Sequence, residues 1–213
     1  HIVLHLIILM FGFTGILGKL ISMGSVQIVF HRVWIASVSL FLFMLLLKRT
    51  FRIANKMTLV GVCITGLVVG ALWITFFEAI QLSTASFGVL CLSTTTLHVS
   101  WLEPIIMKRK FSWMEFGLSL IVVIGIFMVT DDFSGNKLLA LIFGLSSALL
   151  AATFSVFNAK FSQTTAPSTI TLYEMAFATL AIAVLLLING DFNSALWVFS
   201  TSDLAWLLFL GIV

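Results

Sequence analysis

A few ionisable side chains interrupt the long apolar stretches of this chain, and they are the residues that could carry chemistry. Lys19 and Arg32 flank a short turn, and Glu78 follows in the third apolar run. An isolated charge deep in an apolar medium costs about 3 kcal/mol on insertion scales, so such groups usually pair or line a cavity. Two cations and one carboxylate leave a net positive charge, which suits a carboxylate or phosphate group on a small ligand.

Lys19, Arg32 and Glu78 fall on three different predicted helices, near the same side of the predicted bundle. Three interpretations stay open. The side chains could form an ion-paired network that fixes the first three helices, or they could form an anion-binding pocket. Lys19 could instead extend to the polar boundary. We expect Glu78 to be the partner of Arg32.

His98 lies in the fourth apolar run, on a helical face that is otherwise polar and aromatic. Thr94 and Thr95 precede it by about one turn, and Trp101 follows it by about one turn. Because imidazole titrates near neutral pH, His98 is a candidate proton site, and a hydrogen bond to a neighbouring hydroxyl is the alternative. Thr95, His98 and Trp101 are therefore candidate residues for substrate binding or gating.

Two carboxylates lie on the opposite side of the predicted bundle. Glu103 precedes Pro104, which removes the helical hydrogen bond to the carbonyl of Ser100. The sequence therefore predicts either a gating bend or the end of the helix at this point. Glu174 lies early in the seventh run, and we expect it to pair with Lys160. Glu103 and Glu174 join the candidate substrate-binding or gating residues.

The composition indicates that membrane-spanning helices position these side chains. Of the 213 residues, 61% are hydrophobic and 9% are charged, against roughly 25% charged in an ordinary soluble domain. Windows of about 20 residues contain no charge, as a bilayer-spanning helix requires. The formal charge of +3 is a topology signal, so no nucleic-acid partner is expected. A soluble fold is excluded, and the lipid bilayer is an expected partner.

The apolar runs predict an all-α integral membrane protein, a multi-span helical bundle. Each complete run is long enough to cross about 30 Å of hydrocarbon at about 1.5 Å per residue. We expect seven complete spans and the start of an eighth, with antiparallel neighbours because the joins are short. The runs cover residues 2–21, 26–47, 57–80, 84–107, 112–130, 138–159, 168–188 and 203 onward.

The joins between the runs alternate in charge. Those at 48–56 (KRTFRIANK) and 108–110 (KRK) are basic, whereas the alternate joins are acidic. Basic loops stay in the cytoplasm. The sequence therefore predicts a multi-pass protein of the cell inner (plasma) membrane with a cytoplasmic N-terminus. The acidic residues are Asp131, Asp132, Asp191 and Asp203.

A weak internal repeat relates two segments of the chain. The first run ends in GKLI, with Arg32 13 residues after Lys19, and the sixth ends in AKFS, with Glu174 14 residues after Lys160. Five spans separate the two units, an odd number, so the second inserts upside down relative to the first. Such inverted repeats are typical of secondary transporters, in which they open a central site to alternate sides.

The chain resembles the EamA branch of the drug/metabolite transporter superfamily. The resemblance rests on the glycine-rich first helix that ends in lysine, the arginine early in the second, WITFFEAIQLSTAS at 73–86 and LEPIIMKRKFSWMEFGLSLIVVIGIFMV at 102–129. It implies ten helices in two inverted five-helix repeats, here residues 2–130 and an incomplete second repeat at 138–213. It also implies transport of small metabolites or amino acids, outward in many members. Many relatives carry a proline midway along the fourth helix, where this chain has CLSTTTLHVSW.

We therefore expect a secondary active transporter, an exporter of small metabolites such as amino acids. One repeat should rock against the other around a central cavity lined by the first, third, fourth and sixth helices. A channel or scaffold subunit and a lipid-modifying membrane enzyme are the alternatives. An enzyme is not expected, because only scattered Ser and Thr could act as nucleophiles near an interface.

No cofactor is expected for this activity. The histidines and cysteines are scattered, and no phosphate-cradling glycine loop occurs, so gradients must drive transport. The expected partners are a small-molecule substrate and lipid, and a homodimer is left open. Small residues at helical spacing also predict where helices approach closely. These pairs are Gly66 with Gly70, Gly117 with Gly125, and Ala151 with Ser155.

Overall fold

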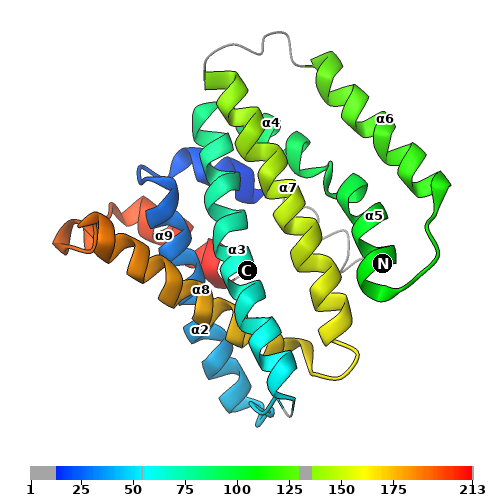
Figure 1. Cartoon of the computed structure of the whole chain (residues 1–213). Helices are drawn as coiled ribbons and strands as arrows, with labels where there is room; N and C mark the ends of the chain where they lie inside the picture. The colour runs from blue at the N-terminus through cyan, green and yellow to red at the C-terminus, as the bar shows by residue number, and fades with distance from the viewer. Residues whose placement is uncertain (1–12, 54, 130–135, 213) are drawn as a thin grey trace.

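The computed structural model describes residues 13–53, 55–129 and 136–212, which fold into a bundle of α-helices with one short 3-10 helix (Figure 1). Residues 13–20 are helical, and residues 2–12 of the first apolar run lie outside the described residues. The remaining elements are α2 (Ser25–Leu46), α3 (Lys56–Leu82), α4 (Ala85–Leu92), α5 (Thr95–Met107), α6 (Trp113–Val129), α7 (Asn136–Phe161), α8 (Pro167–Asn189), η1 (Ser194–Trp197) and α9 (Thr201–Ile212).

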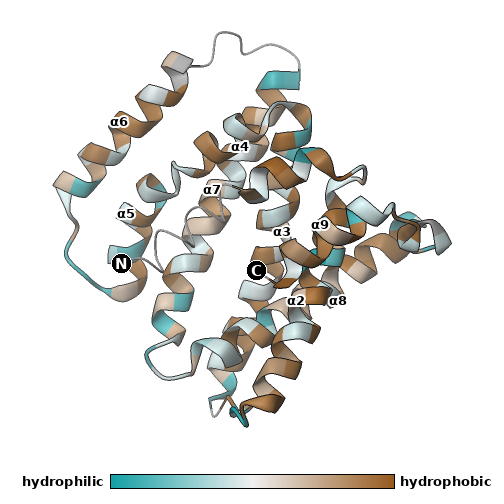
Figure 2. Cartoon of the chain, turned by 180° about the vertical axis from the view of Figure 1, so that it is seen from behind, coloured by the Kyte–Doolittle hydropathy of each residue, from teal (hydrophilic) through white to brown (hydrophobic). Residues whose placement is uncertain are grey.

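The predicted all-α membrane bundle is confirmed. Among the described residues, five segments are long and apolar enough to span a membrane: α2, α3, α4 with α5, α7 and α8. The apolar helices α6 and α9 are shorter than these five. In Figure 2, apolar residues run along α6 and α8, and hydrophilic residues lie mostly near helix ends and in the connections.

Local sequence signals set several helix ends. The side chain of Asn55 accepts a hydrogen bond from the Met57 amide at the start of α3, and Thr84 accepts one from the Phe87 amide at the start of α4. Pro167 opens α8, and Gly190 closes it with φ 76°, a left-handed conformation that glycine adopts without strain.

The fourth apolar run is not one continuous helix as predicted, because it breaks between α4 and α5 at Ser93 and Thr94. Four consecutive hydroxyls, at residues 93–96, each donate to the carbonyl three residues earlier, at 2.5 to 3.1 Å. Such bonds compete with regular helical geometry. Pro104 does not end its helix, since α5 continues to Met107.

α3 is central to the bundle. It packs against α7 and α8, while α2 packs against α8 and α9, and α5 packs against α7. Within this framework the largest buried cluster joins α2, α3, α8 and α9 around side chains such as Ile28, Phe76, Phe77 and Leu207. α6 lies at the edge of the bundle, where its main contact is with α5 (Figure 1).

The predicted close approach at Gly66 and Gly70 is confirmed, and the partner is α8. A Cβ added at Gly66 would lie 2.7 Å from the carbonyl oxygen of Glu174, and one at Gly70 would lie 3.4 Å from Ile182 Cδ1. The glycines of α6 differ from this pair. A Cβ at Gly117 or Gly125 would meet no atom of the described residues within 4 Å.

His31 joins α2 to the segment that precedes α9. It is 1% exposed. Trp34 Nε1 donates to His31 Nδ1 at 3.1 Å, so the other nitrogen, Nε2, carries the proton and donates to the Leu196 carbonyl at 2.9 Å. The rings of Trp197 and Phe199 pack edge-on against the imidazole. Both nitrogens of a neutral imidazole are therefore satisfied, and His31 is a structural residue that the sequence did not single out.

A second set of hydrogen bonds ties the turn that follows the first helix to α9. Ser22 donates to Asp203 through its amide at 3.3 Å and through its hydroxyl at 2.8 Å. The amide of Asp203 in turn donates to the hydroxyl of Ser200, which caps the helix. Asp203, predicted as a residue of an acidic join, is thus a buried linker in the first turn of α9.

Substituting Gly66 tests the contact between α3 and α8. Gly66→Ala should lower stability by about 1–3 kcal/mol, because the added methyl group overlaps the backbone of α8. Gly125→Ala is the matched control and should not lower stability, since its methyl group meets no atom of the described residues within 4 Å and alanine favours a helix over glycine. The thermal unfolding midpoint of the detergent-solubilised protein reports both. Equal midpoints for the two variants would contradict this packing.

His31→Phe should lower the unfolding midpoint, because it leaves the Leu196 carbonyl and the Trp34 indole without partners. The expected cost is about 1–3 kcal/mol. His98→Phe is the control, since His98 Nδ1 is buried without a hydrogen-bond partner among the described residues. The linking role of His31 would be refuted if the two variants unfolded at the same temperature.

Candidate functional site

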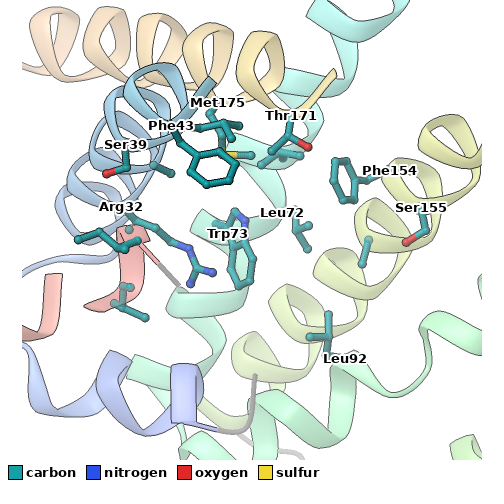
Figure 3. Close-up of a pocket in the computed structure, with 17 residues that line it drawn as sticks. Arg32, Ser39, Phe43, Leu72, Trp73, Leu92, Phe154, Ser155, Thr171 and Met175 are labelled. Atoms are coloured by element: carbon teal, nitrogen blue, oxygen red, sulfur yellow. The ribbon is translucent and has the colours of Figure 1, made fainter. Parts of the chain in front are cut away.

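A cavity of about 710 Å³ opens between α2, α3, α7, α8 and α9, with Leu92 of α4 also on its wall. Most of its wall is apolar, including Leu72, Phe154 and Met175, and the hydroxyls of Ser39, Ser155 and Thr171 add a few polar groups (Figure 3). This size and character match small-molecule sites, which span about 300–1,000 Å³.

The walls differ in part from those predicted. The third, fourth and sixth spans contribute, as expected, through residues such as Trp73, Leu92 and Phe154. However, α2, α8 and α9 also line the cavity, and no described residue of the first helix does. Ala151 and Ser155, predicted as a packing pair, face this space.

Arg32 provides a positive charge at the cavity wall. Its guanidinium carbon lies 3.7 Å from the centre of the Trp73 ring, and the two side chains meet inside the pocket (Figure 3). Nη1 of Arg32 is buried and has no hydrogen-bond partner among the described residues. A cation over an indole gains about 2 kcal/mol when desolvated, but the indole does not neutralise the charge.

The predicted network of Lys19, Arg32 and Glu78 does not form. Lys19 Nζ donates to the carbonyl of Gln81 at 3.0 Å, at the end of α3. Glu78 is half-buried, and in the described part of the chain no ion pair joins it to Lys19 or Arg32. Arg32 lines the cavity with its ring partner Trp73, a residue that sequence reasoning did not single out.

His98, Thr95 and Trp101 lie on α5, away from the cavity wall. Thr95 donates to the Leu92 carbonyl at 2.5 Å, so its hydroxyl is used in a local bond at the break between α4 and α5. Among the described residues no hydroxyl forms the expected bond with His98, and the imidazole lies edge-on to Trp101, with ring centres 6.4 Å apart. The structure thus separates these residues from Arg32.

Glu103 forms an ion pair near the end of α5. Its Oε1 lies 2.5 Å from Nη1 of Arg109, and the Arg109 side chain is 63% exposed. A pair this exposed contributes little to stability. Glu103 lies outside the cavity wall.

Glu174 is fully buried between α3, α7 and α8. Its Oε1 accepts from Thr65 Oγ1 at 2.7 Å, and its Oε2 accepts from Asn158 Nδ2 at 3.2 Å. The expected pair with Lys160 is not made, since Lys160 is exposed and has no ion-pair contact with Glu174. Thr65 and Asn158 are site residues that sequence reasoning missed, although each is a polar side chain inside an apolar run.

The first turns of α8 are tied to the basic loop between α2 and α3. The Thr169 hydroxyl donates to the Thr50 carbonyl at 2.7 Å, and the Tyr173 hydroxyl donates to the Phe51 carbonyl at 3.2 Å. These bonds fix the first turns of α8, which also carry Glu174, relative to this loop.

Arg32→Met tests whether the arginine is retained for stability. Removing a buried charge that forms no ion pair with a described residue should gain several kcal/mol, which exceeds the loss of about 2 kcal/mol from the ring contact. We therefore expect an unchanged or higher unfolding midpoint. Arg109→Met, at an exposed pair, is the control and should shift it little. A midpoint clearly below that of the control would mark Arg32 as a structural residue.

Comparison with known proteins agrees with this architecture. The model of the EamA-like transporter family matches residues 1–131, more than half of the 213-residue chain. Searches of curated proteins and of solved structures gave no match. The helices long enough to span a membrane fit a protein of this class. The chain therefore belongs to the EamA-like transporter family, whose members are membrane transporters of the drug/metabolite type.

Proposed function

We propose that this transporter is a secondary active exporter of small amphipathic metabolites that carry an anionic group, such as amino acids. The observation that carries the proposal is Arg32, a cation at the wall of a largely apolar cavity that forms no ion pair with any described residue. A carboxylate can supply the missing charge and accept hydrogen bonds from the guanidinium in a two-pronged geometry.

The other walls support an amphipathic substrate. Leu72, Phe154 and Met175 offer apolar surface to the body of the molecule, and Trp73 offers a ring face next to the bound anion. The hydroxyls of Ser39 and Thr171 can accept hydrogen bonds from an ammonium group. A substrate with a carboxylate head and an apolar side chain would satisfy both kinds of surface.

The helix contacts support two inverted repeats, residues 2–130 and 138–213. In such a pair α2 corresponds to α8, and α3 corresponds to α9. If the two repeats exchanged places, α9 would take the place of α3 and α2 the place of α8. The contact of α3 with α8 should therefore have a counterpart between α2 and α9, and both contacts are present. The family match also ends at residue 131, close to the proposed boundary. Rocking of one repeat against the other around the cavity would give alternating access.

The basic loops 48–53 and 108–110 support an inner-membrane orientation with a cytoplasmic N-terminus. Arg32 then lies in the outer half of the membrane, and Glu174 lies in the inner half. Export is the direction that the resemblance to the EamA branch implies. A homodimer stays a prediction, as does any gating role for Lys19, Glu78, Thr95, His98, Trp101 and Glu103.

Flux in proteoliposomes tests the proposal. The full chain should move labelled apolar amino acids with saturable kinetics, and Arg32→Gln should reduce flux about tenfold or more, because a charge-assisted hydrogen bond contributes about 1.5–3 kcal/mol. Arg109→Gln, at the exposed ion pair, should retain flux. Equal flux in both variants would refute the role of Arg32. A channel would give flux without saturation, and a scaffold or lipid-modifying enzyme would give none.

A further inference from the structure

We propose that Glu174 is the proton-binding site that couples this carrier to a proton gradient. The inference rests on the proposed transport function. Glu174 is a buried carboxyl that the substrate cavity does not use: it is 0% exposed and is not part of the cavity wall.

The contacts of Glu174 are neutral. Thr65 of α3 and Asn158 of α7 hydrogen-bond its two oxygens. No ion pair joins it to a basic side chain in the described ranges. Of the titratable groups on the packed helices, Arg32 and His31 of α2 are engaged with Trp73 and Trp34. In the described ranges the others form no hydrogen bond or ion pair with the carboxyl: Lys56, Cys63 and Glu78 of α3, Lys137 and Lys160 of α7, and Tyr173 of α8. A buried carboxylate without a cation costs several kcal/mol, and a bound proton removes that cost.

Thr65 can serve both protonation states of the carboxyl. Its hydroxyl has one proton but two oxygens within reach, the Val62 carbonyl at 2.9 Å and Glu174 Oε1 at 2.7 Å. When the threonine donates to Val62, the contact with Glu174 requires a proton from the carboxyl. When Glu174 is ionised, the threonine donates to it instead. The heavy atoms need not move between the two states.

Asn158 has the same property. Its Nδ2 faces Glu174 Oε2 at 3.2 Å, and its Oδ1 is buried without a hydrogen-bond partner among the described residues. Turning the amide over presents an oxygen acceptor to the protonated acid in place of the nitrogen donor. Both partners of Glu174 are therefore groups that can donate or accept.

The position of Glu174 links proton binding to the proposed motion. Thr65 belongs to the first repeat, whereas Asn158 and Glu174 belong to the second, so the carboxyl bridges the surface on which the repeats would slide. Gly66 brings α3 against the backbone of Glu174 at this point. Rocking separates Thr65 from Glu174 and opens the carboxyl to water, where the carboxylate is solvated and the proton leaves. For an exporter, protons that move inward down their gradient drive the cycle.

Infrared difference spectroscopy tests proton binding without any substrate. The full chain in lipid, carried through a pH titration, should show a carbonyl band of a protonated carboxyl that disappears as the pH rises and is missing in Glu174→Gln. Glu103→Gln, at the ion pair with Arg109, is the matched control and should leave the band intact. A band that is absent, that does not titrate, or that survives in Glu174→Gln would overturn the proposal.

Transport assays then separate coupling from transport itself. In Glu174→Gln, uptake driven by a pH gradient should fall to the level without a gradient, while exchange of labelled for unlabelled apolar amino acid should continue. If gradient-driven uptake persists, or if exchange is lost in a variant with a normal unfolding midpoint, Glu174 is not the coupling site. Absence of exchange in the unmodified protein would instead refute the proposed function, and the infrared result would still decide whether Glu174 binds a proton.

Discussion

Polar groups inside a lipid-embedded helix bundle have no water to bind, and this constraint explains most of the polar contacts in the described helices. His31 uses one nitrogen as an acceptor and the other as a donor, and Asp203 binds the amide and hydroxyl of Ser22. Arg32 differs from both, because its buried Nη1 has no hydrogen-bond partner there. Since lipid and helices are similarly apolar, such polar contacts decide much of how the helices associate.

The constraint also explains why some features were predictable. The apolar runs located α2, α3, α7 and α8 to within about two residues at each end, because length and hydropathy are local properties of a sequence. The predicted contact of Gly66 and Gly70 was found for the same reason, since a small-residue pair marks a face. Which helix that face meets is not a local property, and α8 could be identified only in the structure.

The partners of the candidate residues were harder to predict. Spacing placed Lys19, Arg32 and Glu78 near one side of the bundle, but it did not specify their side-chain directions. Lys19 reaches a backbone carbonyl, and Arg32 lies over an aromatic ring. The predictions paired opposite charges with each other. In the structure these charged side chains contact neutral groups instead: a backbone carbonyl, an aromatic ring, a hydroxyl and an amide. The same preference led to the wrong expectation that Lys160 would pair with Glu174.

The break between α4 and α5 has a consequence for how this helix can bend. A proline there would lack an amide proton, so the lost backbone bond could never be restored. Here residues 93–96 all keep their amide protons, and their side-chain hydroxyls bond the carbonyls of residues 90–93, three of which also accept a backbone amide from three residues later. Moving the amides of Thr94 and Thr96 to the carbonyls four residues earlier would close the backbone into a continuous helix. The break between α4 and α5 can therefore close and open again, and closing it leaves no backbone group of residues 93–96 unpaired in lipid.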